Sequence, residues 1–165
     1  MQIYIGADHR GFKLKNKIAD LLKRLGYQVT DMEAFQGEVS CDYPLISYKL
    51  ARRVATTKGS RGILVCMTGI GHAIAANKVP GAYAALCYNK EAAILSRQHN
   101  NANVLVLGAK FVAEKEFPEI IEVWLETKFE GGRHLRRVRQ IKDIEKAQKF
   151  ESKNLKVKAQ DRASK

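Results

Sequence analysis

The sequence is poor in cysteine and proline and has no long apolar run. Three cysteines in 165 residues are few and odd in number, which excludes a disulfide-stabilised scaffold and is typical of a cytoplasmic protein with reduced thiols. Three prolines and 12 glycines are too few for a collagen-like or low-complexity chain. No apolar run reaches the length of a membrane span, about 18 residues, and no secretory leader is visible, so we expect no membrane partner.

Acidic residues are also scarce relative to basic ones. The chain has 29 Lys and Arg against 17 Asp and Glu, a formal net charge of +12. With 45% hydrophobic residues, its 165 residues are enough to bury one domain's core, which excludes a disordered chain. The positive excess leaves three kinds of partner open: nucleic acid, an anionic membrane surface, or a small phosphorylated molecule.

Apolar stretches of strand length alternate with amphipathic stretches of helix length up to about residue 130. This alternation predicts βαβ units, and several strand candidates are apolar at successive positions, as in strands buried on both faces. We predict strands at 2–8, 27–32, 62–67, 82–88 and 103–109, and helices at 11–25, 44–57, 71–78, 90–99 and 113–128. The expected fold is a doubly wound, Rossmann-like α/β/α sandwich with a mainly parallel five-stranded sheet, whose ligand site lies beyond the carboxyl ends of the strands.

The end of the chain has a different pattern. Apolar residues recur every three positions within 133–149, which predicts a C-terminal helix with a narrow apolar seam. Residues 150–165 are rich in Lys and lack this period, so we predict a disordered basic tail there. We expect the folded part to be one domain over 1–149.

The most informative segment is GILVCMTGIGHAIAANK at 62–78, where a predicted strand ends at Cys66 and a glycine-rich turn leads into a helix. Backbone N–H groups of such a turn bind anions. A helix N-terminus also favours a thiolate, which makes Cys66 a candidate base or nucleophile. The alternative is a buried structural cysteine beside glycines that only tighten a turn. A dinucleotide site is disfavoured, because Ile74 occupies the third small position and no acidic residue ends the next strand.

Three further groups of polar residues stand at the ends of predicted elements. Asp8 and His9 follow the first strand, on the same edge as the thiol, and suit either sugar hydroxyls and a phosphate or a helix cap with a solvated imidazole. His99 closes the fourth helix, where it is either a site residue or a complement to the helix dipole. Arg133 and Arg137 are four residues apart and share one helix face, which suits a phosphate or a solvated basic face.

The spacing of the cysteines gives no sign of a metal site. Cys41 and Cys87 have no metal-ligand spacing with each other or with a histidine. We therefore expect both to be ordinary cysteines and expect no metal.

Six segments resemble, in order and spacing, the ribose-5-phosphate isomerase B family, which includes the galactose-6-phosphate isomerase subunits. The segments are GADHRGF (6–12), DYP (42–44), CMTGIG (66–71), IAANK (74–78), SRQHNNANV (96–104) and FEGGRHLRRV (129–138). The resemblance extends from residue 1 to about residue 148 and does not include the tail. It implies an aldose–ketose isomerase that interconverts ribose 5-phosphate and ribulose 5-phosphate through an enediol, with neither a metal nor an organic cofactor.

The resemblance also implies a role for each matching residue. Cys66 is the base that moves the proton between C1 and C2, and His99 assists ring opening together with Thr68. The turn whose backbone holds the enediolate consists of Met67, Thr68, Gly69, Ile70 and Gly71. The residues around the sugar hydroxyls are Asp8, Asp42, Tyr43 and Asn100, and those around the phosphate are His9, Arg133 and Arg137. We add His134, next to Arg133, as a further candidate site residue without an assigned role. In relatives a neighbouring subunit completes the site, which implies a homodimer or homotetramer.

Three residues depart from the family pattern. Met67 stands where glycine is usual, so only its amide is available to an anion. Lys110 stands where an Arg of the neighbouring subunit often joins the phosphate site, which keeps the charge but loses the bidentate contact. His72 matches a Glu that acts as the base in relatives with Ser in place of the cysteine. We expect His72 either to face the substrate and influence the pKa of Cys66 or only to line the pocket or contact the neighbouring subunit.

Two other functions stay open. One is isomerisation of allose 6-phosphate or galactose 6-phosphate; the bulk of Met67 and His72 argues against a six-carbon sugar, and the complete set of His99, Arg133 and Arg137 differs from the galactose subunits. The other is nucleic-acid binding through the basic helix and tail. The aromatic residues, 8% of the chain, are not interleaved with the basic runs, so bases have no obvious surface to stack on, which argues against this function. We expect a small sugar phosphate as the partner and no specific nucleic acid.

Overall fold

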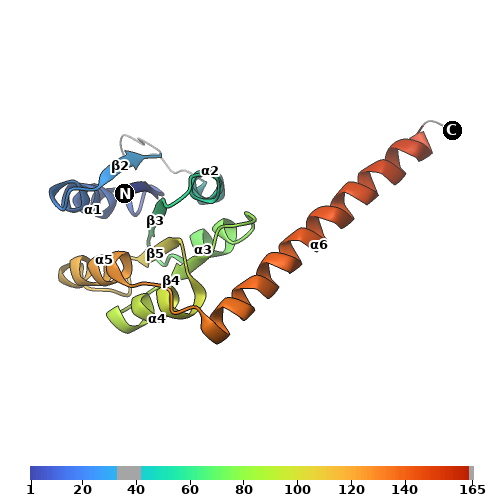
Figure 1. The fold of residues 1–165 in the computed structure, drawn as a ribbon. Helices are drawn as coiled ribbons and strands as arrows, with labels where there is room; N and C mark the ends of the chain where they lie inside the picture. Colours follow the sequence, from blue (N-terminus) through green and yellow to red (C-terminus); the bar gives the residue numbers. More distant parts are fainter. Residues whose placement is uncertain (33–41, 164–165) are drawn as a thin grey trace. The chain divides into compact units, whose positions relative to one another are not determined.

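The computed structural model describes residues 1–32 and 42–163, the last fourteen of these in their backbone only. In chain order (Figure 1) the elements are β1 (Gln2–Ala7), α1 (Phe12–Arg24), β2 (Gln28–Asp31), α2 (Tyr43–Thr56), β3 (Arg61–Cys66), α3 (Ile70–Ala76), β4 (Ala84–Leu86), α4 (Lys90–Asn100), β5 (Val104–Gly108), the short 3-10 helix η1 (Glu114–Glu116), α5 (Phe117–Glu126) and α6 (Gly132–Ala163). The chain divides into two compact units, Met1–Phe129 and Glu130–Lys165. Cys41 lies outside the described residues.

The first unit contains the predicted five-stranded parallel sheet, with strand order β2-β1-β3-β5-β4. After β1 the chain moves outward to β2, and it then crosses back over β1 to form β3. The strand order therefore reverses between β1 and β3, and ligands of doubly wound sheets bind beyond the carboxyl ends of the strands at such a point. The predicted fold class is confirmed.

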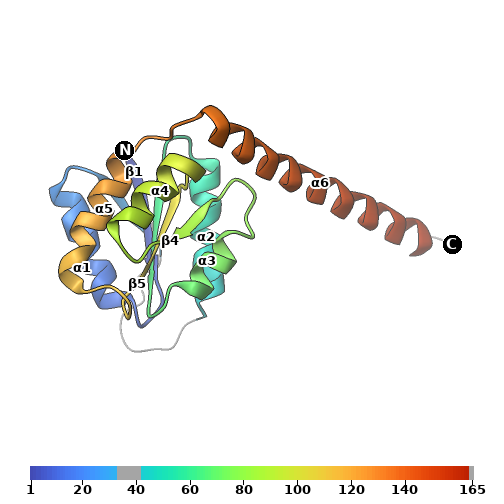
Figure 2. The same cartoon turned by 90° about the horizontal axis from the view of Figure 1, so that it is seen from below.

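Side chains of the sheet alternate between two buried cores. From β1, Ile3 and Ile5 enter a core with α1 and α5, whereas Gly6 faces Ile46 of α2 on the other side. The second core is formed mainly by α2 and the end of α3. Figure 2 shows α1 and α5 on one side of the strands and α2 and α3 on the other. Because helices cover both faces, the central strands are apolar at successive positions, as the sequence predicts.

The fourth strand is shorter than its predicted range of 82–88. It covers only Ala84–Leu86 and pairs on one side, with β5. An edge strand has a partner for only half of its backbone groups, so its pairing ends sooner than that of a central strand.

The last helix differs from the prediction for the C-terminus. Helix α6 continues from Gly132 to Ala163, through most of the segment that the sequence assigns to a disordered tail. Ten of the sixteen residues at 150–165 are Ala, Lys, Arg, Gln, Glu or Leu, which favour a helix. The separate role of 150–165 stays a prediction. Within the described ranges, no helix is both long enough and apolar enough to cross a membrane.

Candidate active site

A thiol and a carboxylate meet at the carboxyl edge of the sheet. Asp8 follows β1 and Cys66 ends β3, and these two strands are neighbours. The Cys66 thiol donates a hydrogen bond to Oδ2 of Asp8, with 2.9 Å between sulfur and oxygen. The other carboxylate oxygen, Oδ1, accepts from the backbone N–H groups of Arg10 at 3.1 Å and Gly11 at 2.9 Å. Asp8 is buried, so the carboxylate is held in one orientation against the thiol.

This pairing gives Asp8 a contact that the family resemblance does not assign to it. The resemblance places Asp8 among the sugar hydroxyls, but both of its oxygens already accept hydrogen bonds from the protein. A buried carboxylate with these partners is an acceptor for the thiol proton, since an ionised carboxylate can only accept. Asp8 therefore serves the thiol, and its contact with the sugar hydroxyls stays a prediction, because an ionised carboxylate has further lone pairs that can accept hydrogen bonds.

The net shift of the Cys66 pKa is opposite to the one predicted from its position before a helix. Burial raises the pKa of the Cys66 thiol, and the hydrogen bond to Asp8 and the negative charge of that carboxylate raise it further. The backbone groups of Gly69 and Thr68 lower the pKa, as expected for amides at a helix start. Burial and Asp8 outweigh these amides, so the resting group is a thiol that needs an acceptor for its proton.

The turn between Cys66 and α3 requires glycine at two positions. Gly69 has φ +78°, a left-handed conformation that costs other residues energy, and a Cβ there would stand 2.5 Å from Leu86. A Cβ on Gly71 would stand 2.5 Å from the ring of Tyr43, so the two lie in close contact. The predicted site residue Tyr43, at the start of α2, is thereby brought to the turn. Asp42, the N-cap of that helix, precedes it in the chain.

His72 lies inside this site and is uncharged. Its side chain is buried, with Nδ1 2.6 Å from Oγ of Ser47, and its ring centre is 5.6 Å from that of Tyr43. Burial lowers the pKa of His72 to about 4, although the charge of Asp8 acts in the opposite direction. A neutral ring has no charge with which to shift the pKa of Cys66, so the predicted influence of His72 on Cys66 is not a charge effect.

The segment after β5 closes the other side of the turn. The backbone N–H of Lys110 donates to the carbonyl of Met67 at 2.8 Å, which fixes the backbone of Lys110 beside the residue that replaces the usual glycine. The side chains of Lys110 and Asp42 are exposed and that of His9 is half-buried. The predicted residues from the ends of β1, β3 and β5 and from the start of α2 thus lie at one edge of the sheet.

His99 and Asn100 lie at the opposite edge. They end α4, which leads into the amino end of β5 at Val104, and Val104 pairs with Gly62. Gly62 is four residues before Cys66 on a parallel strand, which corresponds to about 13 Å along the sheet. One copy of the chain therefore does not bring His99 to Cys66.

The end of α4 is firmly held. The buried guanidinium of Arg97 donates to the carbonyl of Ala102 at 2.5 Å and to Oδ1 of Asn101 at 3.0 Å, and it lies 5.9 Å from the ring centre of Trp124. These contacts fix the turn that follows His99.

The second unit contains the predicted basic residues of the phosphate site. Arg133 and Arg137 lie in the first turns of α6 and share a helix face. Within this unit, Nε2 of His134 is 3.4 Å from Nε of Arg133 and 3.6 Å from a carboxylate oxygen of Glu130.

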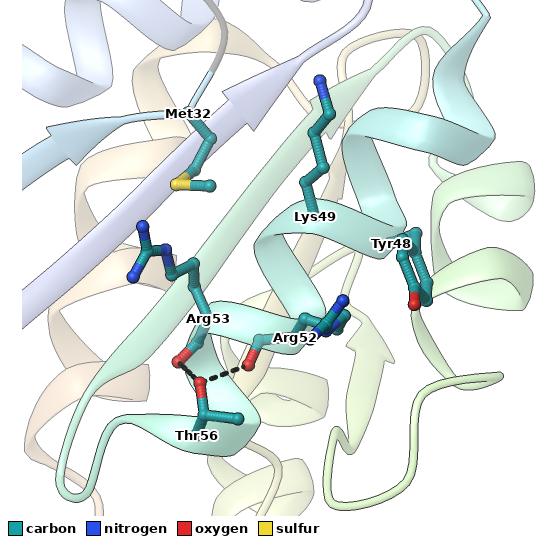
Figure 3. A pocket seen from close by; sticks show the side chains of 6 residues that line it. All are labelled: Met32, Tyr48, Lys49, Arg52, Arg53 and Thr56. Carbon is teal, nitrogen blue, oxygen red and sulfur yellow. Dashed lines mark hydrogen bonds between the residues drawn. The ribbon is translucent and has the colours of Figure 1, made fainter.

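Among the surface hollows of the first unit, two bear on the position of the site. Figure 3 shows one of about 360 Å³ along α2, lined by Met32, Tyr48, Lys49, Arg52, Arg53 and Thr56; none of these is a predicted site residue. A second, of about 480 Å³, is lined by residues that follow β1 and β5, including Arg10 and Ala109. These two are sequence neighbours of His9 and Lys110, so the second hollow adjoins the carboxyl edge.

Two features of the site were not apparent from the sequence. No motif links Ser47 to His72, although the position of Ser47 four residues after Tyr43 in a predicted helix places them on one face. The sequence does indicate that Asp8 and Cys66 lie close together, because they stand at the ends of strands predicted to end at the same edge. It does not indicate that they share a hydrogen bond.

This fold and this edge define a doubly wound α/β protein with a thiol–carboxylate pair beside a glycine-containing turn that starts a helix. The family model described as Ribose/Galactose Isomerase matches residues 3–141. The chain belongs to this family.

Individual relatives agree along most of the chain. A ribose-5-phosphate isomerase B structure from Clostridium thermocellum has 48% identity and a TM-score of 0.86, covering 89% of this chain and 99% of that one. A ribose-5-phosphate isomerase B from Mycoplasma genitalium with bound ribulose-5-phosphate has 41% identity and a TM-score of 0.85, covering 88% and 96%. The D-erythrulose-4-phosphate isomerase of Pectobacterium atrosepticum is 40% identical over 151 residues, 92% of this chain and 99% of that one.

Proposed function

We propose that this protein is an aldose–ketose isomerase that interconverts ribose 5-phosphate and ribulose 5-phosphate. The observation that carries the proposal is the hydrogen bond of 2.9 Å from the Cys66 thiol to Asp8, beside the turn that starts α3. It supplies a base and an acceptor for its proton within one site. The names of the relatives support the choice of substrate.

The residues of this edge account for each proton in the reaction. Asp8 accepts the proton of the Cys66 thiol, and the thiolate then removes the proton from C2 of the open-chain aldose. The electron pair of the C–H bond forms the C1–C2 double bond, and the negative charge moves to the oxygen on C1. N–H groups of the turn at 67–71 stabilise this oxyanion. The proton then returns from Cys66 to C1, and the proton of the C2 hydroxyl passes to the oxygen on C1, which gives the ketose. The steps balance without an electron donor or acceptor.

Ring opening is assigned to His99 of a second copy. Within one copy His99 lies at the amino edge of the sheet and Cys66 at the carboxyl edge. In a homodimer, or a tetramer made of such dimers, sites shared between copies place His99 and Asn100 of one copy at the Cys66 of the other, as their expected roles require. Mixing inactive Cys66→Ala and His99→Asn chains tests this arrangement, because shared sites regain part of the activity and self-contained sites do not.

The remaining predicted residues keep their proposed roles in substrate binding. The phosphate is assigned to four basic side chains: His9, Lys110, Arg133 and Arg137, and His134 stays a further candidate. Asp42 and Tyr43 are assigned to the sugar hydroxyls, with Thr68 close to the reacting carbons. The thiol that this mechanism needs also favours a reducing, cytoplasmic location.

The main alternative is a sugar phosphate with four or six carbons as the substrate, since one relative is a D-erythrulose-4-phosphate isomerase and the family description includes galactose. The test is kcat/KM for four-, five- and six-carbon sugar phosphates, measured with pure protein in the presence of EDTA. We expect the highest value for ribose 5-phosphate. No isomerisation of it between about pH 6 and 9, a range around the usual pKa of cysteine, overturns the proposal.

A further inference from the structure

We propose that Asp8, Cys66 and His72 form a binding site for a zinc-like divalent cation. A ring nitrogen of His72, the sulfur of Cys66 and a carboxylate oxygen of Asp8 all lie within 4.8 Å of one another. The three residues come from the ends of two strands and from a helix, so they do not form a metal-binding motif with a regular spacing in the sequence. The expectation of no metal rested on the spacing of Cys41 and Cys87 and on the resemblance to a family whose reaction needs no metal.

The hydrogen bonds of His72 identify the nitrogen that is available to a metal. The hydroxyl of Ser47 donates to the carbonyl of Tyr43 at 2.9 Å, and a hydroxyl has only one proton. Nδ1 of His72, 2.6 Å from the same hydroxyl, is then the donor, which leaves Nε2 with its lone pair. Nε2 is buried and has no hydrogen-bond partner among the described residues. A second group that holds the far ring nitrogen is a regular feature of histidines that bind metals.

The chemistry of the three groups selects the cation. Thiolate, imidazole and carboxylate together are typical zinc ligands, whereas magnesium and calcium prefer sites made of oxygen alone. Ligand atoms of a tetrahedral zinc site stand about 3.5 Å apart, so closure of the site requires movements of about 1 Å. Asp8 is already oriented through its other oxygen. Three protein ligands leave the fourth position to water or to a substrate oxygen.

When zinc binds, it replaces the proton of the Cys66 thiol. The S–H bond of Cys66 breaks, its proton goes to solvent, and a sulfur–zinc bond forms, with no change in oxidation state. Oδ2 of Asp8 exchanges its hydrogen bond from the thiol for a bond to the metal. Zinc would occupy the thiol that serves as the base, so it inhibits the isomerase reversibly; this consequence, unlike the binding itself, rests on the proposed function.

The experiment uses the full chain after treatment with EDTA and removal of the chelator. Zinc is titrated in competition with a chromophoric chelator, and cobalt(II) is added separately to detect the absorption band of a cobalt–thiolate bond. We expect one zinc per chain and a cobalt–thiolate band. Cys66→Ser should abolish the band, and His72→Asn should weaken zinc binding roughly tenfold or more. Cys41→Ala and Cys87→Ala are the matched controls and should keep both signals.

Other results overturn the site. They are no stoichiometric zinc, a cobalt–thiolate band that persists in Cys66→Ser, or unchanged zinc affinity in His72→Asn; circular dichroism shows that each variant is folded. Isomerase activity of the same samples separates the two proposals. Inhibition by zinc that EDTA reverses supports both, whereas zinc binding by a protein that is inactive in EDTA supports the metal site and contradicts the proposed function.

Discussion

Two cysteines at the carboxyl ends of strands in the same sheet have very different surroundings. Cys66 ends β3, is half-buried and donates to Asp8. Cys87 follows β4 and is buried in the core that contains α1 and α5. Burial raises the pKa of Cys87 to about 11, although a hydrogen bond with Ser96 lowers it. Both thiols have raised pKa values, so what distinguishes the reactive candidate is access to solvent and a carboxylate that accepts its proton.

The largest expected effect is the loss of activity on removal of the Cys66 thiol. Removal of the Cys87 thiol serves as the comparison, because that thiol is expected to contribute to packing and not to catalysis. Cys66→Ala removes the proposed base, and we expect the rate of ribose 5-phosphate isomerisation to fall by about 10²–10⁴-fold. Cys87→Ala should leave this rate within about a factor of two. Steady-state assays of both variants check the prediction, and equal losses in the two would remove the distinction between the thiols.

Ionisation of the buried Cys87 thiol should lower the free energy of unfolding at high pH. Cys87 ionises near the usual cysteine pKa of 9.0 when unfolded and near 11 when folded. Its stabilising contribution is therefore complete below about pH 9 and is lost as the pH rises to about 11, by roughly 3 kcal/mol.

Cys87→Ala should lack this loss while being less stable than the wild type at pH 7 by about 1 kcal/mol. Urea unfolding of the two proteins at pH 7, 9 and 11 measures both differences. Parallel stability curves over the whole range would show that Cys87 is not a buried neutral thiol.

The carboxylate beside Cys66 should control its ionisation. Asp8→Asn removes the negative charge and the proton acceptor, so the pKa of Cys66 should fall, because Asp8 raises it through both the hydrogen bond and the charge. The rate of Cys66 alkylation against pH reports this pKa. We expect the curve to move to lower pH and turnover to fall about tenfold or more. A shift to higher pH would contradict the assignment of Asp8.

Much of the fold and part of the site could be predicted from the sequence, for physical reasons. Alternating apolar and amphipathic segments fix the strand and helix order, and strand ends such as Asp8 and Cys66 meet at one edge because the strands are parallel. The sequence could not predict how strongly burial opposes the helix amides at Cys66. That balance depends on the depth of the side chain, which only the packing determines.

The contacts of His72 illustrate the same limit, whereas the position of His99 is predictable. The sequence placed His72 at the site, but the hydrogen bond to Ser47 depends on how α2 packs against α3. The edge on which His99 lies follows from strand direction, since a helix that precedes a parallel strand ends at the amino edge. The family resemblance lists His99 with Cys66 without stating which copy provides each.

Alkylation with substrate protection tests the central claim most directly. The wild-type protein, free of metal, is treated with limiting iodoacetamide at pH 8, with and without ribulose 5-phosphate, and each cysteine is quantified by peptide mass spectrometry alongside the remaining isomerase activity. The account predicts that activity falls in proportion to the labelling of Cys66, that ribulose 5-phosphate slows both together, and that Cys87 stays unlabelled. Full activity in protein whose Cys66 is completely alkylated would contradict it.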